Sequence, residues 1–373
     1  MAQFQKQHFI PQFYLRNFSD ETGRQISLLN AKTGRFVSGA SIRHQAQRRN
    51  LYENVENEKL LGSFEGAAAP IIRNVIETHQ LPEKGSFSHF ILVAFLILMH
   101  ARTPTHMDEA SHGLAQLMRE AIKGHPDAND LGDLTNLSFS GTLEMHFSAV
   151  FNSLPYAIDL QAGLIQNKTN TPFVTSDHPC VFWNPFLERK VKWASITGVA
   201  NKGLVITLPL TPFLCLVLFD DGTYKLGGRS RILSLNNLNN IRDINVLQGV
   251  NCSQLLFGGS GLLAPGEMRR AIETAKPFRS SRCRMVGRGM VVDSENDSQG
   301  EMLHYRKWEP RINLEIPGFR LLKKATRYQL TGSAAEPRNP ELFKKMRGYE
   351  PSWQGSMNID EVIDEIRKEM KCK

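Results

Sequence analysis

The segment Thr175-Ser176-Asp177-His178-Pro179 places an acid, two hydroxyls and an imidazole within five residues. It follows a short apolar run with strand character, and loops at strand ends frequently carry catalytic groups. A carboxylate there can stabilise positive charge or activate water, so Asp177 is a candidate catalytic residue, with Ser176 and His178 as candidate substrate ligands. The alternative is a local turn in which the same side chains satisfy backbone groups.

The string from Gln7 to Phe18 surrounds His8 with aromatic side chains. We take His8 as a second candidate catalytic group. The residues that could orient a planar substrate beside it are Phe9, Phe13, Tyr14 and Arg16. In the alternative interpretation the apolar residues of this string belong to the core and His8 makes a structural hydrogen bond.

Glu65 and Arg102 are the remaining candidate catalytic residues. Helical spacing of apolar residues from Glu58 to His79 places Glu65 on a helix. Arg102 follows the apolar run 87–101, so a charge stands where an apolar helix ends. A cation at that position often serves only the helix dipole. The run is shorter than the roughly 20 residues that span a bilayer, which favours a buried core helix.

The elements around these candidates change type along the chain. Helical spacing covers 58–79, 87–101 and 107–123, while 26–30 and 35–37 flank a glycine turn and predict a hairpin. Beyond Tyr156, short strand-like runs are separated by Pro, Gly and Asn, followed by helical spacing over 235–252 and 266–275 and a short strand over 255–257 between them. The pattern predicts an α+β fold with a helical N-terminal half packed on a mainly antiparallel sheet.

The expected domain organisation is one α+β domain over 1–330, helix-rich over 1–155 and sheet-rich over 156–330. A loosely attached tail, 331–373, ends in a predicted amphipathic helix. Its apolar stripe comprises Ile359, Val362, Ile363, Ile366 and Met370. Such a stripe docks on its own chain or on a protein partner.

Composition limits the compartment and the cofactors. The polar start of the chain lacks an apolar run leading to a cleavage site, so we expect a cytoplasmic protein. The five cysteines lie far apart without a Cys-x-x-Cys pair, and His100, His106 and His112 recur at a spacing that does not share one helical face. We therefore predict no metal and no cofactor.

The formal charge of +8 favours polyanionic partners, nucleic acid first. Positive residues concentrate from Arg269 to Arg288, against Glu273 alone. Arg279, Arg282 and Arg284 are candidate phosphate ligands in this run. A solvated charged face is the alternative.

Together these motifs resemble a bacterial family named domain of unknown function 4238. The resemblance covers about 6–260 and rests on His8-x-x-Pro11 with the following Gln12 to Phe18, the Glu65 helix, Arg102-Thr103-Pro104, Thr175 to Pro179, and Leu208 to Pro212. The family more often has Asn where this chain has His178. The resemblance implies that His8, Glu65, Arg102 and Asp177 meet in one cleft.

The first functional hypothesis is a DNA-acting hydrolase without a metal, specifically an N-glycosylase that excises a modified base in anti-phage defence. Cleavage of a glycosidic bond passes through an oxocarbenium-like state that one ionised carboxylate can stabilise. A flipped base needs an aromatic or polar pocket, and the phosphates need a positively charged track.

Two alternatives stay open. A metal-dependent nuclease could use Asp177, Glu188 and Lys190 to hold Mg²⁺ and position water. A non-catalytic module could bind nucleic acid or a nucleotide through the same pocket. Attachment to a membrane surface has no lipidation motif or basic amphipathic helix in its favour.

Overall fold

The structure is a computed structural model that describes most of the chain. The described residues are 6–49, 51–52, 55–122, 139–190, 195–259, 261, 265–280, 284–293, 298–307, 311–316, 318–328 and 337–346.

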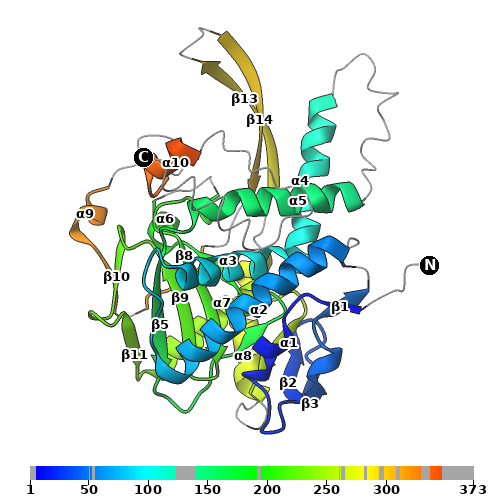
Figure 1. Cartoon of the computed structure of the whole chain (residues 1–373), viewed down its shortest axis with the longest axis vertical. Helices are drawn as coiled ribbons and strands as arrows, with labels where there is room; N and C mark the ends of the chain where they lie inside the picture. The colour runs from blue at the N-terminus through cyan, green and yellow to red at the C-terminus, as the bar shows by residue number, and fades with distance from the viewer. Residues whose placement is uncertain are drawn as a thin grey trace.

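Four helices form the first half of the chain: α2 (Val55–Thr78), α3 (Phe87–Ala101), α4 (Pro104–Ile122) and α5 (Phe139–Ser153). Ser86 caps α3 by accepting a hydrogen bond from the His89 amide at 3.2 Å, and most of the side chains of this helix are buried. Between α3 and α4 the chain bends by 70°. Figure 1 shows α2 and α3 side by side, with α4 rising away from them.

Among the described residues, no single helix has the length and apolar character needed to cross a membrane, although α3 and the start of α4 pass that test as a bent pair. The predicted helix over 87–101 is confirmed with the same bounds as α3.

The larger sheet has the order β11-β5-β9-β8-β7 and lies behind the helices in Figure 1. Its strands are β5 (Gln161–Asn167), β7 (Val181–Trp183), β8 (Val205–Thr211), β9 (Leu214–Phe219) and β11 (Ile232–Leu235). All neighbours pair antiparallel except β11 with β5. Both faces of β8 and β9 are buried because helices cover one face and the second hydrophobic cluster covers the other.

A second sheet has the order β3-β2-β12-β6, with strands β2 (Gln25–Asn30), β3 (Phe36–Ser41), β6 (Thr175–Ser176) and β12 (Leu255–Gly258). The predicted hairpin is β2 and β3, closed by Gly34 at φ 69°. Since β6 pairs with β12, the residues after Ser176 emerge beside the loop that precedes β12.

The N-terminal segment lies on the helical layer. β1 (Lys6–His8) pairs with β4 (Gln47–Arg49). α1 (Gln12–Arg16) follows β1, and the 3₁₀ turn η1 (Ile42–His44) precedes β4. These short elements hold His8 against the helices.

Helices α7 (Leu238–Asn251) and α8 (Pro265–Ser280) pack closely beneath the sheets. A Cβ at Gly249 would come within 2.7 Å of the Ala271 carbonyl, so only glycine permits this approach. The predicted helices over 235–252 and 266–275 correspond to α7 and α8. α7 is shorter at both ends than predicted, and α8 extends five residues further, to Ser280.

Smaller elements complete the chain. They are η3 (Leu154–Tyr156), α6 (Pro185–Glu188), the pair β10 (Tyr224–Leu226) and β15 (Phe319–Leu321), the pair β13 (Arg284–Asp293) and β14 (Ser298–Lys307), α9 (Lys323–Thr326) and α10 (Pro340–Met346). In Figure 1 the β13-β14 ribbon projects from the body beside α4.

The α+β prediction is confirmed, because helices precede a mainly antiparallel sheet rather than alternating with it. One hydrophobic cluster contains Leu92 and Phe95 of α3 together with Leu208 of β8 and Leu216 of β9, so the two halves share a core. The predicted strand from Ala157 begins only at Gln161, since η3 and a turn occupy the residues before it. The predicted amphipathic helix of the tail lies outside the described residues.

Candidate functional site

Arg102 stands at the C-terminal end of α3, where its amide donates to the Leu98 carbonyl. Its side chain is only 6% exposed. The guanidinium donates to the Tyr52 hydroxyl at 2.8 Å, to the His8 carbonyl at 2.6 Å, and to Oε1 of Glu65 in a short ion pair. The pKa of Arg102 is raised: burial opposes its charge, but the neighbouring Tyr52 and Glu65 outweigh that effect. It is therefore a fixed cation.

Glu65 lies in the middle of α2, in the stripe that faces the N-terminal segment. The buried residues Leu61, Ala68 and Ile72 belong to the same stripe. Whereas Arg102 is buried, the Glu65 side chain is 25% exposed. Its Oε1 binds Arg102, and within the described part of the chain no hydrogen bond engages Oε2. One carboxylate oxygen is thus held and the other is open to a ligand or water.

The His8 ring lies between the backbone carbonyl of Gln45 and the side-chain amide of Gln12. Its Nδ1 is 3.1 Å from the Gln45 carbonyl and its Nε2 is 3.0 Å from Nε2 of Gln12. A carbonyl only accepts, so Nδ1 carries the proton and Nε2 accepts from Gln12. Burial lowers the pKa of His8, opposed by its bond to Gln45 and by the charge of Glu65. The hydrogen-bond partners and the lowered pKa both favour the neutral form of His8.

We call Glu65, Arg102 and His8 the Glu65 cluster. The structure brings these three candidates together from α2, α3 and β1. Three residues that the sequence did not indicate support the cluster. The Tyr52 hydroxyl accepts from Arg102, and the Tyr52 amide donates to the Gln7 side chain at 2.9 Å. The Gln7 side chain in turn donates to Glu58 at 2.9 Å. Glu58 precedes Glu65 by two helical turns, so a second acid on the same face of the helix could have indicated it from the sequence. No sequence pattern indicated Tyr52.

Asp177 does not join this cluster. Its carboxylate accepts hydrogen bonds from the amides of Ser253, Gln254 and Leu255 at 2.7, 2.7 and 3.0 Å. The side chain is buried, and burial raises its pKa despite these donors. The expected catalytic carboxylate thus anchors the loop between α7 and β12.

Arg279 holds the same loop from α8 rather than facing solvent. Its guanidinium donates to the carbonyls of Gly249, Cys252 and Ser253. These bonds use three of the five guanidinium donors to hold the loop. Arg282 lies outside the described residues, as does the side chain of Arg284.

Three expected substrate ligands are buried in the core. Tyr14 is fully buried, donating to the Pro209 carbonyl at 2.7 Å and lying 2.6 Å from the Thr175 hydroxyl. Ser176 is also fully buried and donates to Gln248 at 2.8 Å, while His178 contacts the Thr103 hydroxyl through Nδ1. The hydrogen bonds of these three side chains join the N-terminal and central motifs to neighbouring segments. Because the side chains are buried, little of their surface is accessible to a ligand.

The remaining N-terminal candidates differ in exposure. Phe9 and Phe13 are half-buried against the core, and the Phe13 ring lies 5.8 Å from that of Phe95. Arg16 is exposed, and its guanidinium lies 3.5 Å from the Gln12 side chain.

Four histidines form a row beside the Glu65 cluster. The His100 ring centroid lies 4.5 Å from that of His178 and 4.6 Å from that of His106, which lies 5.1 Å from that of His146. The spacing of His100 and His106 does not align on a straight helix, but the bend between α3 and α4 brings the rings together. Within the described residues, no group of three or more His, Cys, Asp or Glu side chains has the geometry to hold a metal ion.

The residues of the nuclease alternative lie in a different part of the fold. Glu188 accepts from Trp183 Nε1 at 3.1 Å and from the amides of Ile312 and Asn313 at 3.2 Å each. Lys190 donates to the Tyr328 carbonyl at 3.0 Å. Asp177 and Glu188 therefore bind separate backbone segments.

A family model described as Protein of unknown function (DUF4238) matches residues 6–261, which is more than half of the chain. The chain belongs to this family. No curated protein and no solved structure matches it significantly.

The DUF4238 match contains the whole Glu65 cluster and its supporting residues, whereas all of α8 and the tail lie beyond it. The segments that carry the resemblance meet in two places. Tyr14, Thr175 and Pro209 meet in the core, and His8, Glu65 and Arg102 meet where one carboxylate is partly exposed.

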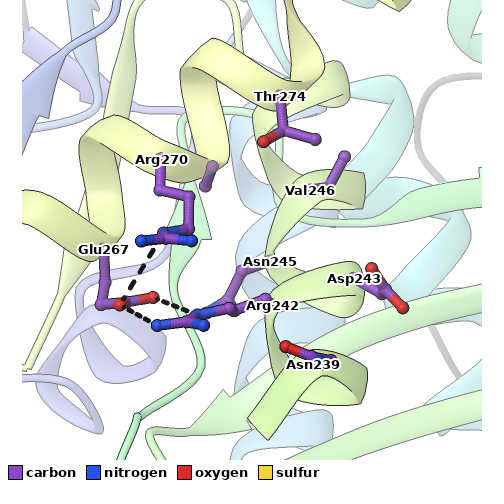
Figure 2. A pocket seen from close by; sticks show the side chains of 9 residues that line it. Asn239, Arg242, Asp243, Asn245, Val246, Glu267, Arg270 and Thr274 are labelled. Atoms are coloured by element: carbon purple, nitrogen blue, oxygen red, sulfur yellow. Dashed lines mark hydrogen bonds and ion pairs between the residues drawn. The ribbon is translucent and has the colours of Figure 1, made fainter.

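Helix α7, inside the family match, and helix α8, beyond it, enclose a small groove of about 210 Å³. Arg242 donates to both oxygens of Glu267 at 3.0 and 2.7 Å, and Arg270 approaches the same carboxylate at 4.0 Å. Figure 2 shows both guanidinium groups pointing toward Glu267 from opposite helices. Two arginines thus share one acid. Of the basic run expected from the sequence, Arg269, Arg270 and Lys276 are exposed on α8.

Proposed function

We propose that this DUF4238 chain is a DNA-acting hydrolase, specifically an N-glycosylase that excises a modified base in bacterial anti-phage defence, and that Glu65 is its catalytic carboxylate. One observation carries the proposal. Glu65 is partly exposed and held through one oxygen by a buried arginine, beside a neutral histidine.

The arrangement suits glycosidic bond cleavage. As the bond from the sugar C1′ to the base nitrogen breaks, its electron pair leaves with the base and the sugar gains oxocarbenium character. An ionised carboxylate beside the sugar stabilises that charge and removes a proton from the attacking water. The departing base takes up the proton that Glu65 removed from the water, so the products are the neutral free base and an abasic sugar, and the carboxylate is restored. Oε2 of Glu65 serves this role because Arg102 holds Oε1.

His8 and Gln12 supply polar groups at the edge of the same cluster. The Nε2 atom of neutral His8 accepts a hydrogen bond, and Gln12 has both a donor and an acceptor. A flipped base presents donors and acceptors on its pairing edge, which such side chains can read. Phe9 and Phe13 are half-buried nearby in sequence and offer apolar surface.

A basic surface favours DNA as the substrate. The formal charge of +8 favours polyanions, and exposed Arg269, Arg270 and Lys276 lie along α8. We place the phosphate track there.

The test is to incubate the purified chain with plain DNA and with phage-modified DNA, with and without EDTA, and then to heat in alkali. Strand breaks that appear only after alkali, and persist in EDTA, reveal abasic sites and support the proposal. Direct breaks that require a divalent metal favour the nuclease alternative. Binding without either kind of break favours the non-catalytic module.

Variants assign the role of Glu65. Glu65→Gln keeps the size of the side chain but removes its charge, and base release should fall by at least about 100-fold while binding persists. Glu77→Gln changes an exposed acid on the same helix and should leave the rate unchanged. If base release survives in Glu65→Gln, another group carries the chemistry.

A further inference from the structure

An apolar groove of about 420 Å³ lies on the sheet side of the molecule, away from the Glu65 cluster. Buried rings of Trp183, Phe186 and Tyr224 form its floor, and Phe319 and Leu321 of β15 form one wall. Leu321 is 40% exposed, one of four large apolar side chains that are exposed among the described residues. Leu321 therefore leaves apolar surface open to solvent at the wall of the groove.

Two charged side chains of opposite sign line the opening of the groove, Arg189 and Glu315. Arg189 pairs with Glu315 at 2.8 Å across the opening, and both side chains are largely exposed. The neighbouring segment 320–327 carries further exposed positive residues and no acid; these are Arg320, Lys323, Lys324 and Arg327. An occupant of this groove should therefore combine an apolar face with acidic flanks.

The tail of this chain has that composition. The stripe residues Ile359, Val362, Ile363 and Ile366 recur at the i, i+3, i+4 and i+7 spacing of helix-in-groove ligands. Acids flank the stripe at Asp360, Glu361, Asp364, Glu365 and Glu369. Two or three branched aliphatic side chains fill a cavity of this size.

The chain is also anchored close to the groove just before the tail begins. Arg338 forms a buried ion pair with Asp159 at 2.6 Å, and its amide donates to the Ala200 carbonyl at 2.7 Å. Nearby, Lys202 lies 4.5 Å from the Tyr328 ring, which packs 5.6 Å from that of Phe186 in the groove floor. Only a few side chains separate the anchor from the groove.

A linker joins the end of α10 to the predicted helix of the tail. Helix α10 ends at Met346, and eleven residues separate it from Asn358. An extended chain spans up to about 3.5 Å per residue, so this linker reaches more than about 30 Å. We propose that residues 358–370 dock in cis as an amphipathic helix in the groove formed by Trp183, Phe186, Tyr224, Phe319 and Leu321.

The experiment places a photo-crosslinking residue, p-benzoylphenylalanine, at Leu321 of the full chain, and in a second variant at Glu315. Mass spectrometry then maps the crosslinked peptides in an equal mixture of ¹⁴N- and ¹⁵N-labelled protein. The expected product joins either position to the peptide 357–371 within one isotope label.

Tail variants show that the contact depends on the apolar stripe. Ile366→Glu should reduce the crosslinking yield at least about tenfold and raise hydrogen exchange in β15. Lys368→Glu adds an acid to the opposite face of the same segment and should leave both readouts unchanged. The probe at Leu321 replaces part of the groove wall and could disturb it. The second probe, at Glu315 on the rim, leaves that wall intact and serves as a check.

Three results would overturn the proposal. Mixed-isotope crosslinks would show that the tail docks on a second copy. Crosslinks to another segment would show a different occupant. An unchanged yield in Ile366→Glu would show that the stripe does not carry the contact.

Discussion

Arg102 and Glu65 join the end of α3 to the middle of α2 through an ion pair in which the cation is buried and the carboxylate is partly exposed. The pair is therefore asymmetric. Arg102 has three partners that fix its position, while Glu65 keeps one oxygen toward solvent.

Removing the acid should cost stability as well as activity. Glu65→Ala leaves the buried guanidinium without its counter-charge, and we expect a loss of about 2–4 kcal/mol in the free energy of unfolding. Urea unfolding measures the change. Glu77→Ala, at an exposed position on the same helix, should shift the free energy by less than about 0.5 kcal/mol. Equal losses for the two variants would contradict a special role for the pair.

Asp177 should behave as a structural residue. Asp177→Ala strands the amides of Ser253, Gln254 and Leu255 in a buried site, with a loss of about 2–4 kcal/mol. Hydrogen exchange at these amides should rise before any other part of the chain responds. The exposed Asp221, changed to Asn, serves as control. A fully stable Asp177→Ala variant that lost only catalysis would restore Asp177 to the chemistry.

The contribution of three buried histidines to stability should fall as pH drops below about 6.5. Burial lowers the pKa of His8, His89 and His146 below the ordinary value of 6.5. The unfolded chain then binds protons that the folded chain does not, so acid favours unfolding from pH 6.5 down to the folded pKa values. Each histidine adds up to about 1.4 kcal/mol per pH unit within that window.

Unfolding in urea between pH 5 and pH 8 measures this slope. His89→Gln should make it shallower, because one buried imidazole that donates to the Leu160 carbonyl no longer titrates. His44→Gln, at an exposed position, should leave it unchanged. If the His89 variant shows the same dependence of unfolding free energy on pH as the native chain, groups other than His89 cause the acid sensitivity.

DNA binding should depend on α8. Changing Arg269 and Arg270 to Ala removes two exposed cations, and each lost phosphate contact should lower the slope of log affinity against log salt by about 0.9. Filter binding from 50 to 200 mM salt gives this slope. Arg229→Ala removes an exposed cation from a turn elsewhere and should change little. An unchanged slope in the α8 variant would move the phosphate track to another surface.

The sequence alone determined the local elements. Apolar spacing predicted α3 over its full length, and Gly34 between two short strand-like runs predicted the β2-β3 hairpin. These features depend on residues within one or two turns of one another, where periodicity and turn chemistry are sufficient. The motifs also indicated Glu65, Arg102 and His8 as partners, although not through which atoms.

Only the tertiary structure decided where the side chains at the element ends point. Asp177 emerges from β6 beside the loop before β12, because β6 pairs with β12, and its carboxylate therefore binds backbone amides instead of the Glu65 cluster. His100 and His106 meet because the chain bends by 70° at Arg102 and Thr103, which no helical period describes. Pairing partners and bends are set by contacts between residues far apart in the chain, and a single sequence does not encode them as a local pattern.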